Sequence, residues 1–483
     1  MDKVRRLFCS FCGNLFLPLV LVSVRPNLAV AGSVVKFLPG FEGPLPFELE
    51  TGYIGVGESE DVQLFYHFVK SESNPQTDPL LIWLTGGPGC SSFGGLTSGI
   101  GPVKFQPVLC NGTLTALVTN PYSWTKVASI IFLDSPVGAG FSYARTAKAS
   151  QSTDLQASEH NYEFLRKWLH DNPEYISNSF YIGGGSYAGI TVPILAQLVS
   201  NGNVAGIEPH IHLKGYLLGN PAPTTQGDGN HAIPFAHRTA LISDELYESL
   251  KVTCKGEYVN IDPSNAPCLK NIQAYNKLID NINIEHVLEP TCPDVSPKPN
   301  SLFSGRRSTV ETFYKKFEEL DVLEFNPVQC RAATAEKLIY YWANDMSVQE
   351  ALHGTIKEWV GCNYSILYTK NAGSVVPYHA NLSTKGYRSL IYSGDHDMIS
   401  PYLGTEEWIR SLNYPIIDDW RQWIHQGQVA GYTRTYANKM TFATVKARNP
   451  SFSCFSGAGH IASYNKPAEC RSMFGRWISY QPL

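Results

Sequence analysis

The stretch that decides the fold of this chain is "FYIGGGSYAGITVP", residues 180–193. Gly184, Ser186 and Ala188 approximate the pattern G-x-S-x-G, in which a tight turn between a strand and a helix presents a serine nucleophile. Small neighbours suit such a turn because its backbone is crowded and strained. The same glycine run also resembles the phosphate-binding loop of dinucleotide-binding proteins. The stretch therefore predicts either a nucleophile or a phosphate cradle, and the rest of the chain has to decide.

The residues around this stretch alternate between short apolar runs and helical patterns. Strand-like runs occur at 80–84 and 129–134, and apolar residues at helical spacing cover 156–171 and 190–200. The pattern returns at 389–397, where a strand-like run leads into an acidic turn. This alternation predicts an α/β fold, in which a mostly parallel central sheet is flanked by helices.

The character of the sequence changes between these two α/β parts. Short helical patterns such as 242–254 precede a stretch rich in Pro, Ser and Arg. We predict an inserted, mainly helical cap over 219–323, with an exposed linker near 293–307. The α/β core is then divided into a first part, 32–218, and a second part, 324–483.

The first residues have the features of a targeting segment. A basic start, "MDKVRR", precedes an apolar stretch and a small-residue cleavage site, Ala29-Val30-Ala31. We expect a signal peptide over 1–31, which would leave a lumenal or secreted protein without a membrane attachment. A signal anchor is the alternative, although the apolar stretch is short for one.

Length and composition exclude several classes of protein. The chain has 483 residues, of which 43% are hydrophobic and 17% charged, as expected for a folded globular protein. Its formal charge of -4 does not indicate a nucleic-acid-binding protein, which would typically be basic. Beyond the leader the sequence contains no H-E-x-x-H and no paired C-x-x-C, so we expect no metal and no other cofactor.

A nucleophilic serine needs a base within hydrogen-bond reach and a carboxylate that orients the base. In α/β hydrolases these partners follow the serine in the order Asp, then His. Three histidines lie far enough downstream of Ser186, namely His396, His425 and His460. His425 lies in an amphipathic stretch without turn residues and is interpreted as structural. His460 closes "SGAGH", a glycine turn after a strand-like run, and is the predicted base.

Two aspartates compete for the role of the orienting acid. Asp395 and Asp397 both lie in "SGDHDM", directly after a strand-like run. One carboxylate is expected to cap the turn and the other to orient the histidine. Their spacing does not choose between them.

The transition state of acyl transfer also needs N–H donors for its oxyanion. "WLTGGPGCSS", residues 83–92, follows an apolar strand and contains two glycines and a Pro-Gly turn. An early loop of this kind offers a backbone N–H, here that of Gly87, and the second N–H is that of Tyr187, directly after the nucleophile. The alternative for residues 83–92 is a plain tight turn.

The dinucleotide alternative rests on Gly183, Gly185 and Ala188, which match G-x-G-x-x-A. That site needs an acidic residue about 20 positions further on, at the end of a second strand. Glu208 stands at this distance, but its context, "EPHIH", indicates a loop. The serine nucleophile is therefore favoured.

Five motifs together resemble the plant serine carboxypeptidase-like proteins. In chain order they are "WLTGGPGCSS" (83–92), "SPVGAGFSYA" (135–144), "GGSYAGITVP" (184–193), "YSGDHDMISP" (392–401) and "GAGH" (457–460). The resemblance extends over about residues 37–477 and implies an α/β-hydrolase fold. It also selects Asp397 as the acid that orients His460.

The same resemblance bears on the cysteines, because a secreted protein folds in an oxidising compartment. Eleven cysteines are present, and Cys9 and Cys12 fall in the leader, which leaves nine. The implied disulfides are Cys90–Cys362, Cys254–Cys268 and Cys292–Cys330. No partner is assigned to Cys110, Cys454 and Cys470. Three sequons predict glycosylation at Asn111, Asn363 and Asn381.

The family contains carboxypeptidases and acyltransferases, and "LTGG" resembles the acyltransferase branch. Peptidases typically have Asn where this chain has Thr85, and Glu where it has Gly99 and Gly185; together these groups hold the substrate's terminal carboxylate. Without them, burying a peptide carboxylate costs several kcal/mol. We expect the substrate to contact Trp83, Thr85, Gly86 and Gly185.

We therefore predict an acyltransferase that moves an acyl group from a glucose ester through acyl-Ser186 to an acceptor hydroxyl or amine, in the vacuole or outside the cell. One alternative is a carboxypeptidase or esterase with the same triad, acting on a peptide C-terminus or an ester. Another is a catalytically impaired relative that acts by binding. That last alternative is motivated by Gly185 and by residues 447–456, which intervene where relatives pass directly from strand to histidine turn.

Overall fold

A computed structural model describes residues 32–105, 117–224, 229–292, 331–446 and 457–483. Several predictions concern residues outside these ranges: the signal peptide over 1–31, the linker near 293–307, the extra residues 447–456, and Cys110, Cys330, Cys454 and Asn111. Within the described ranges, no helix combines the length and the apolar character that a membrane crossing requires.

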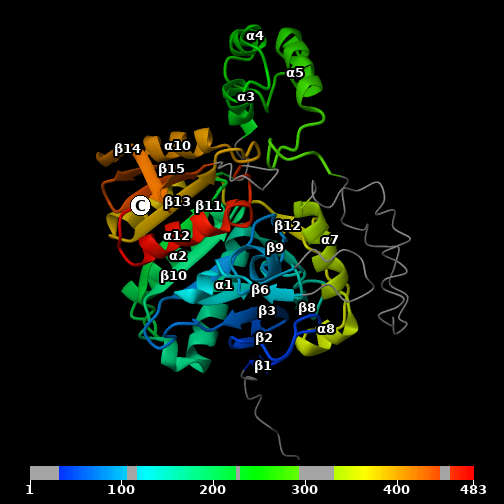
Figure 1. Cartoon of the computed structure of the whole chain (residues 1–483), viewed down its shortest axis with the longest axis vertical. Helices are drawn as coiled ribbons and strands as arrows, with labels where there is room; N and C mark the ends of the chain where they lie inside the picture. The colour runs from blue at the N-terminus through cyan, green and yellow to red at the C-terminus, as the bar shows by residue number, and fades with distance from the viewer. Residues whose placement is uncertain (1–31, 106–116, 225–228, 293–330, 447–456) are drawn as a thin grey trace, which may run out of the picture. The chain divides into compact units, whose positions relative to one another are not determined.

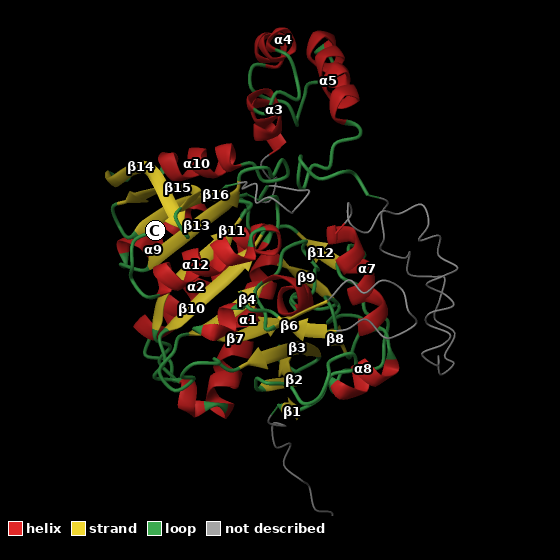
Figure 2. Cartoon of the chain, in the orientation of Figure 1, coloured by secondary structure: helices red, strands yellow, loops and turns green. Residues whose placement is uncertain are grey.

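A twelve-stranded sheet forms the centre of the fold, with helices on both faces (Figure 2). Its central strands are parallel, in the order β7 (Ser129–Leu133), β4 (Leu80–Leu84), β10 (Phe180–Gly185), β11 (Leu213–Gly219), β13 (Arg388–Gly394) and β16 (Met440–Val445). The α/β prediction is confirmed, and the predicted parallel arrangement holds for the centre of the sheet.

Both flanks of the sheet are antiparallel, so the sheet as a whole is mixed. The first flank consists of β1 (Ser33–Val35), β2 (Leu49–Val56) and β3 (Val62–Val69), with β8 (Tyr143–Ala144) paired to β3. The second consists of β15 (Gln428–Tyr436) and β14 (Ile416–His425). These strands were not predicted from the sequence.

The central strands are unbroken apolar runs because both of their faces are buried. In β4, Leu81 and Trp83 face one hydrophobic cluster, whereas Leu80, Ile82 and Leu84 face another. The second cluster is covered by α1 (Asp154–Asp171), α2 (Ala188–Val204), α9 (Val376–Thr384) and α10 (Tyr402–Ser411). The first is covered by α7 (Arg331–Ala343), α8 (Met346–Ala351) and α12 (Pro467–Ile478) (Figure 1).

Shorter elements shape the loops at the edges of the sheet. They are β5 (Val103–Phe105), β6 (Leu117–Thr119), β9 (Gln151–Thr153), β12 (Leu367–Thr369), α11 (Ala462–Asn465) and the helical turns η1 (Gly95–Gly99), η2 (Trp124–Lys126) and η3 (Pro173–Tyr175). β9 and β12 pair in parallel as a separate ribbon, and β5 and β6 pair antiparallel.

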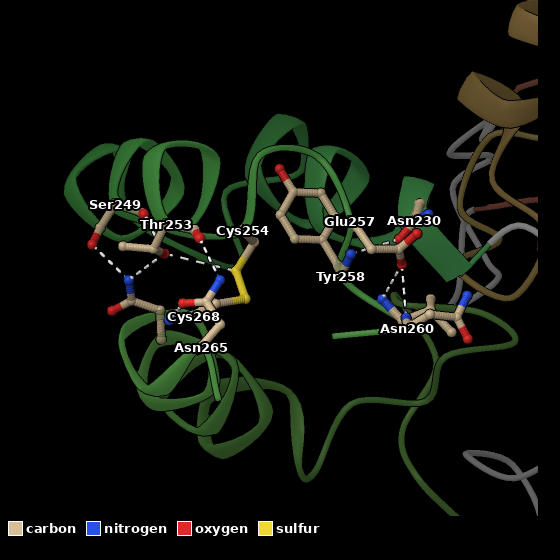
Figure 3. The surroundings of a disulfide bond; sticks show 11 residues. Asn230, Ser249, Thr253, Cys254, Glu257, Tyr258, Asn260, Asn265 and Cys268 are labelled. Atoms are coloured by element: carbon tan, nitrogen blue, oxygen red, sulfur yellow. Dashed lines mark hydrogen bonds between the residues drawn. A yellow bond between two sulfur atoms is a disulfide. The ribbon is translucent and has the colours of Figure 1, made fainter. Parts of the chain in front are cut away.

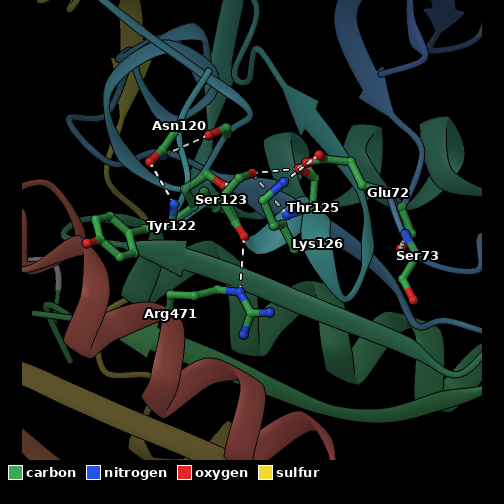
Figure 4. Close-up of polar contacts among 11 residues, drawn as sticks. Glu72, Ser73, Asn120, Tyr122, Ser123, Thr125, Lys126 and Arg471 are labelled. Carbon is green, nitrogen blue, oxygen red and sulfur yellow. Dashed lines mark hydrogen bonds and ion pairs between the residues drawn. The ribbon is translucent and has the colours of Figure 1, made fainter. Parts of the chain in front are cut away.

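Polar contacts fix the residues directly after η1 and those directly before η2 (Figure 4). Asn120 Nδ2 donates to the carbonyl of Gly101 at 2.9 Å, and the Ser123 hydroxyl accepts the N–H of Thr125 at 3.1 Å. Arg471 of α12 donates from Nε to the Ser123 carbonyl at 3.1 Å. These bonds tie the loop next to Gly99 to the C-terminal helix.

Three helices within the predicted cap have a hydrophobic cluster of their own: α3 (Gly229–Arg238), α4 (Asp244–Cys254) and α5 (Ala266–Ile279). The Cys254–Cys268 disulfide joins α4 to α5 (Figure 3). Beside it, Asn265 donates to the Thr253 carbonyl at 2.9 Å and accepts the Cys268 N–H at 3.2 Å. Helix α4 matches the pattern at 242–254, while the cap boundaries stay a prediction.

Replacing both Cys254 and Cys268 with Ser should loosen α4 and α5 and leave the sheet intact. The bridge spans a sequence separation of 14 residues. In the chain-entropy account, closing a loop of this length stabilises the fold by about 3 kcal/mol. Hydrogen exchange should then become faster in α4 and α5 and stay slow in β4 and β10. Unchanged exchange in α4 and α5 would contradict this account of the cap.

Candidate active site

Ser186 lies in the turn between β10 and α2, in a left-handed backbone conformation with φ of +58°. Its N–H donates to the Gly219 carbonyl at 3.0 Å, which fixes the turn against β11. A Cβ on Gly184 would lie only 2.7 Å from the Cβ of Ala188. Glycine is therefore required at 184, because the strand and the helix approach each other closely on either side of the serine.

His460 Nε2 lies 2.8 Å from the Ser186 hydroxyl oxygen. The backbone N–H of His460 donates to the Glu285 carbonyl at 2.7 Å. The preceding N–H, that of Gly459, donates to Asn465 Oδ1 at 3.0 Å. The turn "GAGH" is thus anchored from two sides, and it places the imidazole within proton-transfer distance of the serine.

Asp397 Oδ2 lies 2.8 Å from Nδ1 of His460, and the carboxylate is fully buried. The same oxygen accepts a hydrogen bond from Asn220 Nδ2 at 2.8 Å. The other oxygen accepts the N–H groups of Ile399 at 2.8 Å and Ser400 at 3.3 Å. Three donors besides the histidine therefore hold the buried carboxylate in one orientation.

The remaining candidates of the sequence analysis lie elsewhere. Among the described residues, Asp397 and not Asp395 is hydrogen-bonded to His460; the Asp395 carboxylate contacts His396 Nδ1 at 2.6 Å. His425 is the last residue of β14, at a two-residue hairpin formed by Gln426 and Gly427 with φ of +48° and +71°. The interpretation of that stretch as lacking turn residues was wrong, because Gln426 adopts the left-handed conformation that a tight hairpin needs.

The electrostatics of the site act on the base in opposite directions. Burial lowers the pKa of His460, but the charge and hydrogen bond of Asp397, together with the charge of Glu285, outweigh burial. The pKa of His460 is therefore raised above its ordinary value. Because only a neutral imidazole can accept the serine proton, activity should rise as pH increases through this raised pKa.

Gly86 and Gly87 bring the early loop against the nucleophile. A Cβ on Gly86 would lie 2.5 Å from the Tyr187 nitrogen and 2.7 Å from the Ser186 Cβ, and Gly87 has a φ of +110°. Glycine alone suits both positions. Within the described ranges, the N–H groups of Gly87 and Tyr187 donate to no acceptor of the protein. Both N–H groups are available to an oxyanion next to Ser186.

A disulfide and a buried carboxylate hold the early loop, residues 83–92, on the side away from Ser186. The Cys90–Cys362 disulfide is present, and the Ser91 N–H donates to the Gly361 carbonyl at 2.8 Å. Asp134, at the end of β7, accepts the Ser91 hydroxyl at 2.7 Å and the Ser92 N–H at 2.9 Å. Burial raises the pKa of Asp134 to about 6, against the lowering effect of these hydrogen bonds. The disulfide and the buried carboxylate hold the loop that carries Gly87.

The two glycines that depart from the peptidase pattern, Gly99 and Gly185, both have room for a Cβ. A Cβ at Gly185 would be 3.4 Å from the Gly219 carbonyl oxygen, and one at Gly99 would be 3.5 Å from the Ser463 hydroxyl. Both are ordinary contact distances, so the backbone here does not demand glycine. At Gly99 and Gly185 the chain therefore lacks the carboxyl side chains of the peptidases, although a Cβ would fit at both positions.

Of the other residues predicted to contact the substrate, Gly86 and Thr85 lie near the nucleophile, whereas Trp83 does not. Gly86 adjoins Ser186, and the neighbouring Thr85 hydroxyl is paired with the Ser92 hydroxyl at 3.1 Å. Trp83 is only 7% exposed and packs edge-on against Trp124, with ring centroids 5.6 Å apart. Trp83 therefore lies in the hydrophobic core.

Sequence reasoning missed Asn220, which is buried and has a φ of +46°. Besides its bond to Asp397, its Oδ1 accepts the Gly394 N–H at 3.2 Å, so it joins the acid turn to the end of β11. Its position directly after a buried parallel strand was a usable signal, because the carboxyl ends of parallel strands meet at one edge of the sheet.

Sequence reasoning also missed residues 284–287, from the predicted cap. The Met398 N–H donates to the Ile284 carbonyl at 2.9 Å, and the Val287 N–H donates to the His396 carbonyl at 3.1 Å. With the bond from His460 to Glu285, this segment holds the acid turn and the base turn together. No sequence signal marks it, because all three bonds use backbone atoms.

Cysteines and sequons complete the predicted sites. Cys90–Cys362 and Cys254–Cys268 are confirmed, Cys292 is disulfide-bonded, and Cys470 is a buried free thiol. Asn381 is exposed, whereas Asn363 is half-buried and donates to the Gly138 carbonyl at 3.0 Å. Glycosylation stays a prediction. Among the described residues, no group of His, Cys, Asp and Glu is arranged to hold a metal ion.

A serine on a strand–turn–helix elbow, with Asp and His on loops after later parallel strands, defines an α/β hydrolase. The chain belongs to the serine carboxypeptidase family, whose model matches residues 39–480. Serine carboxypeptidase-like 11 of Arabidopsis thaliana is 52% identical over 457 residues, 94% of this chain and 95% of that protein. Serine carboxypeptidase-like 2 from the same plant is 50% identical over 481 residues, 99% of each.

A solved structure supports the same fold. The prohormone-processing carboxypeptidase of Saccharomyces cerevisiae superposes with a TM-score of 0.68 over 92% of this chain and 95% of that chain. Its sequence identity is 19%, so the likeness concerns the fold alone. The predicted family and fold class are both confirmed.

Replacing Asp397 with Asn should lower the pKa of His460, because the effect of burial would then be opposed by the charge of Glu285 alone and no longer by that of Asp397. The pKa can be followed by NMR titration of the imidazole. Activity should fall roughly ten-thousandfold, as expected when a triad loses the carboxylate that sets the histidine tautomer. Asp395→Asn is the matched control and should leave the pKa of His460 in place. An unchanged pKa in Asp397→Asn would contradict the electrostatic account.

Proposed function

We propose that this protein is a serine-dependent acyltransferase that takes an acyl group from a glucose ester and passes it to an acceptor hydroxyl or amine. The observation that carries the proposal is the continuous hydrogen-bonded row from Ser186 through His460 to Asp397, with 2.8 Å at each link. The N–H groups of Gly87 and Tyr187 complete the proposed machinery.

In the first half-reaction, Ser186 Oγ attacks the ester carbonyl carbon while its proton passes to His460 Nε2. The carbonyl oxygen becomes an oxyanion and binds the N–H groups of Gly87 and Tyr187. When the tetrahedral intermediate collapses, the bond to the glucose oxygen breaks, and that oxygen takes the proton from His460. The products are free glucose and acyl-Ser186.

In the second half-reaction, His460 accepts the proton of the acceptor hydroxyl or amine as that group attacks the acyl carbon. The second tetrahedral intermediate binds the same two N–H groups and collapses with release of the serine oxygen. Ser186 recovers its proton from His460. Asp397 keeps Nδ1 of the imidazole protonated, so that Nε2 is the nitrogen that exchanges the proton in both halves.

The choice of transfer over peptide cleavage rests on the three positions at which this chain departs from the peptidase pattern. The peptidases of the family typically have Asn, Glu and Glu at three positions where this chain has Thr85, Gly99 and Gly185. A peptide's C-terminal carboxylate would enter this space without the side chains that neutralise it, at a desolvation cost of several kcal/mol. A neutral sugar ester carries no such charge.

The alternative of an impaired relative predicts a displaced histidine. In the structure, His460 reaches both Ser186 and Asp397, and its turn is anchored by Glu285 and Asn465. This geometry supports a working triad in the chain with residues 447–456 present. An esterase or carboxypeptidase with the same triad remains the second candidate, since water can replace the acceptor in the second half-reaction.

The proposed partners and location follow from the same argument. The substrates are small molecules, namely a glucose ester of a phenolic or aliphatic acid and an acceptor. The predicted signal peptide and the disulfides support a place in the secretory pathway, in the vacuole or outside the cell.

Replacing Ser186 with Ala should abolish acyl transfer and leave folding intact, because the change removes the nucleophilic oxygen alone. Purified wild type and variant are each incubated with glucose esters, with and without an alcohol or amine acceptor, and the products are separated. Wild type should form the acylated acceptor in excess over free acid. A blocked dipeptide should release no C-terminal amino acid.

Three outcomes would change the proposal. Turnover retained by a folded Ser186→Ala variant would contradict the nucleophile. Release of free acid at the same rate with and without acceptor would favour the esterase. Rapid cleavage of the dipeptide would favour the carboxypeptidase.

A further inference from the structure

Asp154 is a fully buried carboxylate outside the triad, and it is the first residue of α1. One oxygen accepts the hydroxyl groups of Tyr187 and Tyr368, both at 2.8 Å. The other accepts the N–H groups of Asn371 at 2.6 Å and Ala372 at 2.9 Å. In the described part of the chain no Lys, Arg or His pairs with Asp154, so these four donors and the helix N-terminus stabilise its charge.

Three of the four donors have an evident structural task. Tyr368, Asn371 and Ala372 belong to one segment, which pairs with residues 151–153 through the β12–β9 ribbon. Their bonds to Asp154 continue this ribbon and fasten the segment to the start of α1. The ring of Tyr368 also packs edge-on against the ring of Tyr187, with ring centroids 6.4 Å apart, and Tyr368→Phe would keep this ring contact.

The fourth donor, Tyr187, is different because it directly follows Ser186. Its backbone N–H is one of the two proposed oxyanion donors, and its ring is only 8% exposed. Burial, followed by the hydrogen bond and charge of Asp154, raises the pKa of the Tyr187 hydroxyl well above its ordinary value. The hydroxyl therefore stays protonated and donates to Asp154 over the whole working range of pH.

The peptide plane that carries the Tyr187 N–H has an anchor at each end. At one end the Ser186 carbonyl accepts the N–H groups of Gly189 at 2.9 Å and Ala222 at 3.1 Å. The other end is the Tyr187 Cα, from which the side chain reaches Asp154. The next peptide plane is fixed as well, because the Tyr187 carbonyl accepts the Ile190 N–H at 3.0 Å. The bond to Asp154 ties Tyr187 to a different helix, α1.

We propose that Asp154 is a positioning residue for the oxyanion site. By holding the Tyr187 hydroxyl, it fixes the direction of the Tyr187 N–H toward the oxygen of the tetrahedral intermediate. This inference rests on the proposed function, in that it takes Ser186 as the nucleophile and Tyr187 as an oxyanion donor. It adds a connection between α1 and the reacting atoms that neither the triad nor the early loop supplies.

Two tyrosine variants form a matched pair that tests this inference. Tyr187→Phe and Tyr368→Phe each delete one hydroxyl that donates to the same Asp154 oxygen at the same 2.8 Å. They should therefore lower the melting temperature by similar amounts. Only Tyr187→Phe alters a residue whose N–H faces the oxyanion, so only this variant should slow the chemistry.

The measurements are the rate at which a fluorophosphonate labels Ser186, and kcat and KM for an activated ester. For Tyr187→Phe we expect the labelling rate and kcat to fall about tenfold with KM unchanged. A catalytic group misplaced by about 1 Å costs roughly a hundredfold in rate. Loss of one hydroxyl should displace the Tyr187 N–H by less than that. For Tyr368→Phe we expect both rates to stay within about twofold of wild type, because its loss affects stability alone. Asp154→Asn, where it folds, should show the losses of both variants.

The outcomes separate this inference from the proposed function. Equal rates in wild type and Tyr187→Phe, or equal losses in the two tyrosine variants, would overturn the positioning role and leave the nucleophile in place. No labelling of folded wild type would overturn the proposed function, and this inference with it. A loss of kcat confined to Tyr187→Phe supports the positioning role.

Discussion

The turn at Ser186 is the constraint on which the site depends. A serine there has a φ of +58°, a conformation that residues with a side chain seldom adopt, and the surrounding structure must hold it. Gly184, Ala188 and Gly86 leave the space that the turn needs, and the Gly219 carbonyl fixes its backbone. The strain is maintained because β10 lies in the middle of the sheet, between β4 and β11.

The parallel centre of the sheet brings the other groups to this turn. Ser186 and His460 are 274 positions apart in sequence, and Asp397 and His460 are 63 apart. They meet because their loops follow β10, β13 and β16, whose carboxyl ends lie at one edge of the sheet. Residues 284–287, from the predicted cap, then join the acid turn to the base turn through backbone hydrogen bonds. Movement of this segment would disturb both turns at once.

Much of the fold could be predicted from local patterns, because the central strands and helices carry their signal in their own residues. The antiparallel flanks could not, since strands such as β14 are largely exposed and show no clean alternation. In the site, the elbow and the glycine turn identified Ser186 and His460 as candidates. The choice of Asp397 over Asp395 needed the family resemblance, because two aspartates in one turn differ only in the direction of their side chains.

Contacts that join distant segments were harder to predict. Asn220 lies 177 positions from Asp397, and only its place directly after a buried strand pointed to it. The Glu285 carbonyl carries no side-chain signature at all. Trp83 was expected to contact the substrate, but its side chain in β4 points into the hydrophobic core. Each of these cases depends on how separate segments meet in the assembled fold.

The most direct test of the account is to trap the intermediate. Wild-type protein is mixed with a glucose ester in the absence of acceptor and quenched in acid, and the peptides are then analysed by mass spectrometry. The account predicts an acyl mass on the peptide that contains Ser186, and its discharge when an alcohol or amine acceptor is added before the quench. A folded protein that forms product without an adduct on Ser186, or that carries the acyl group on another residue, would contradict it.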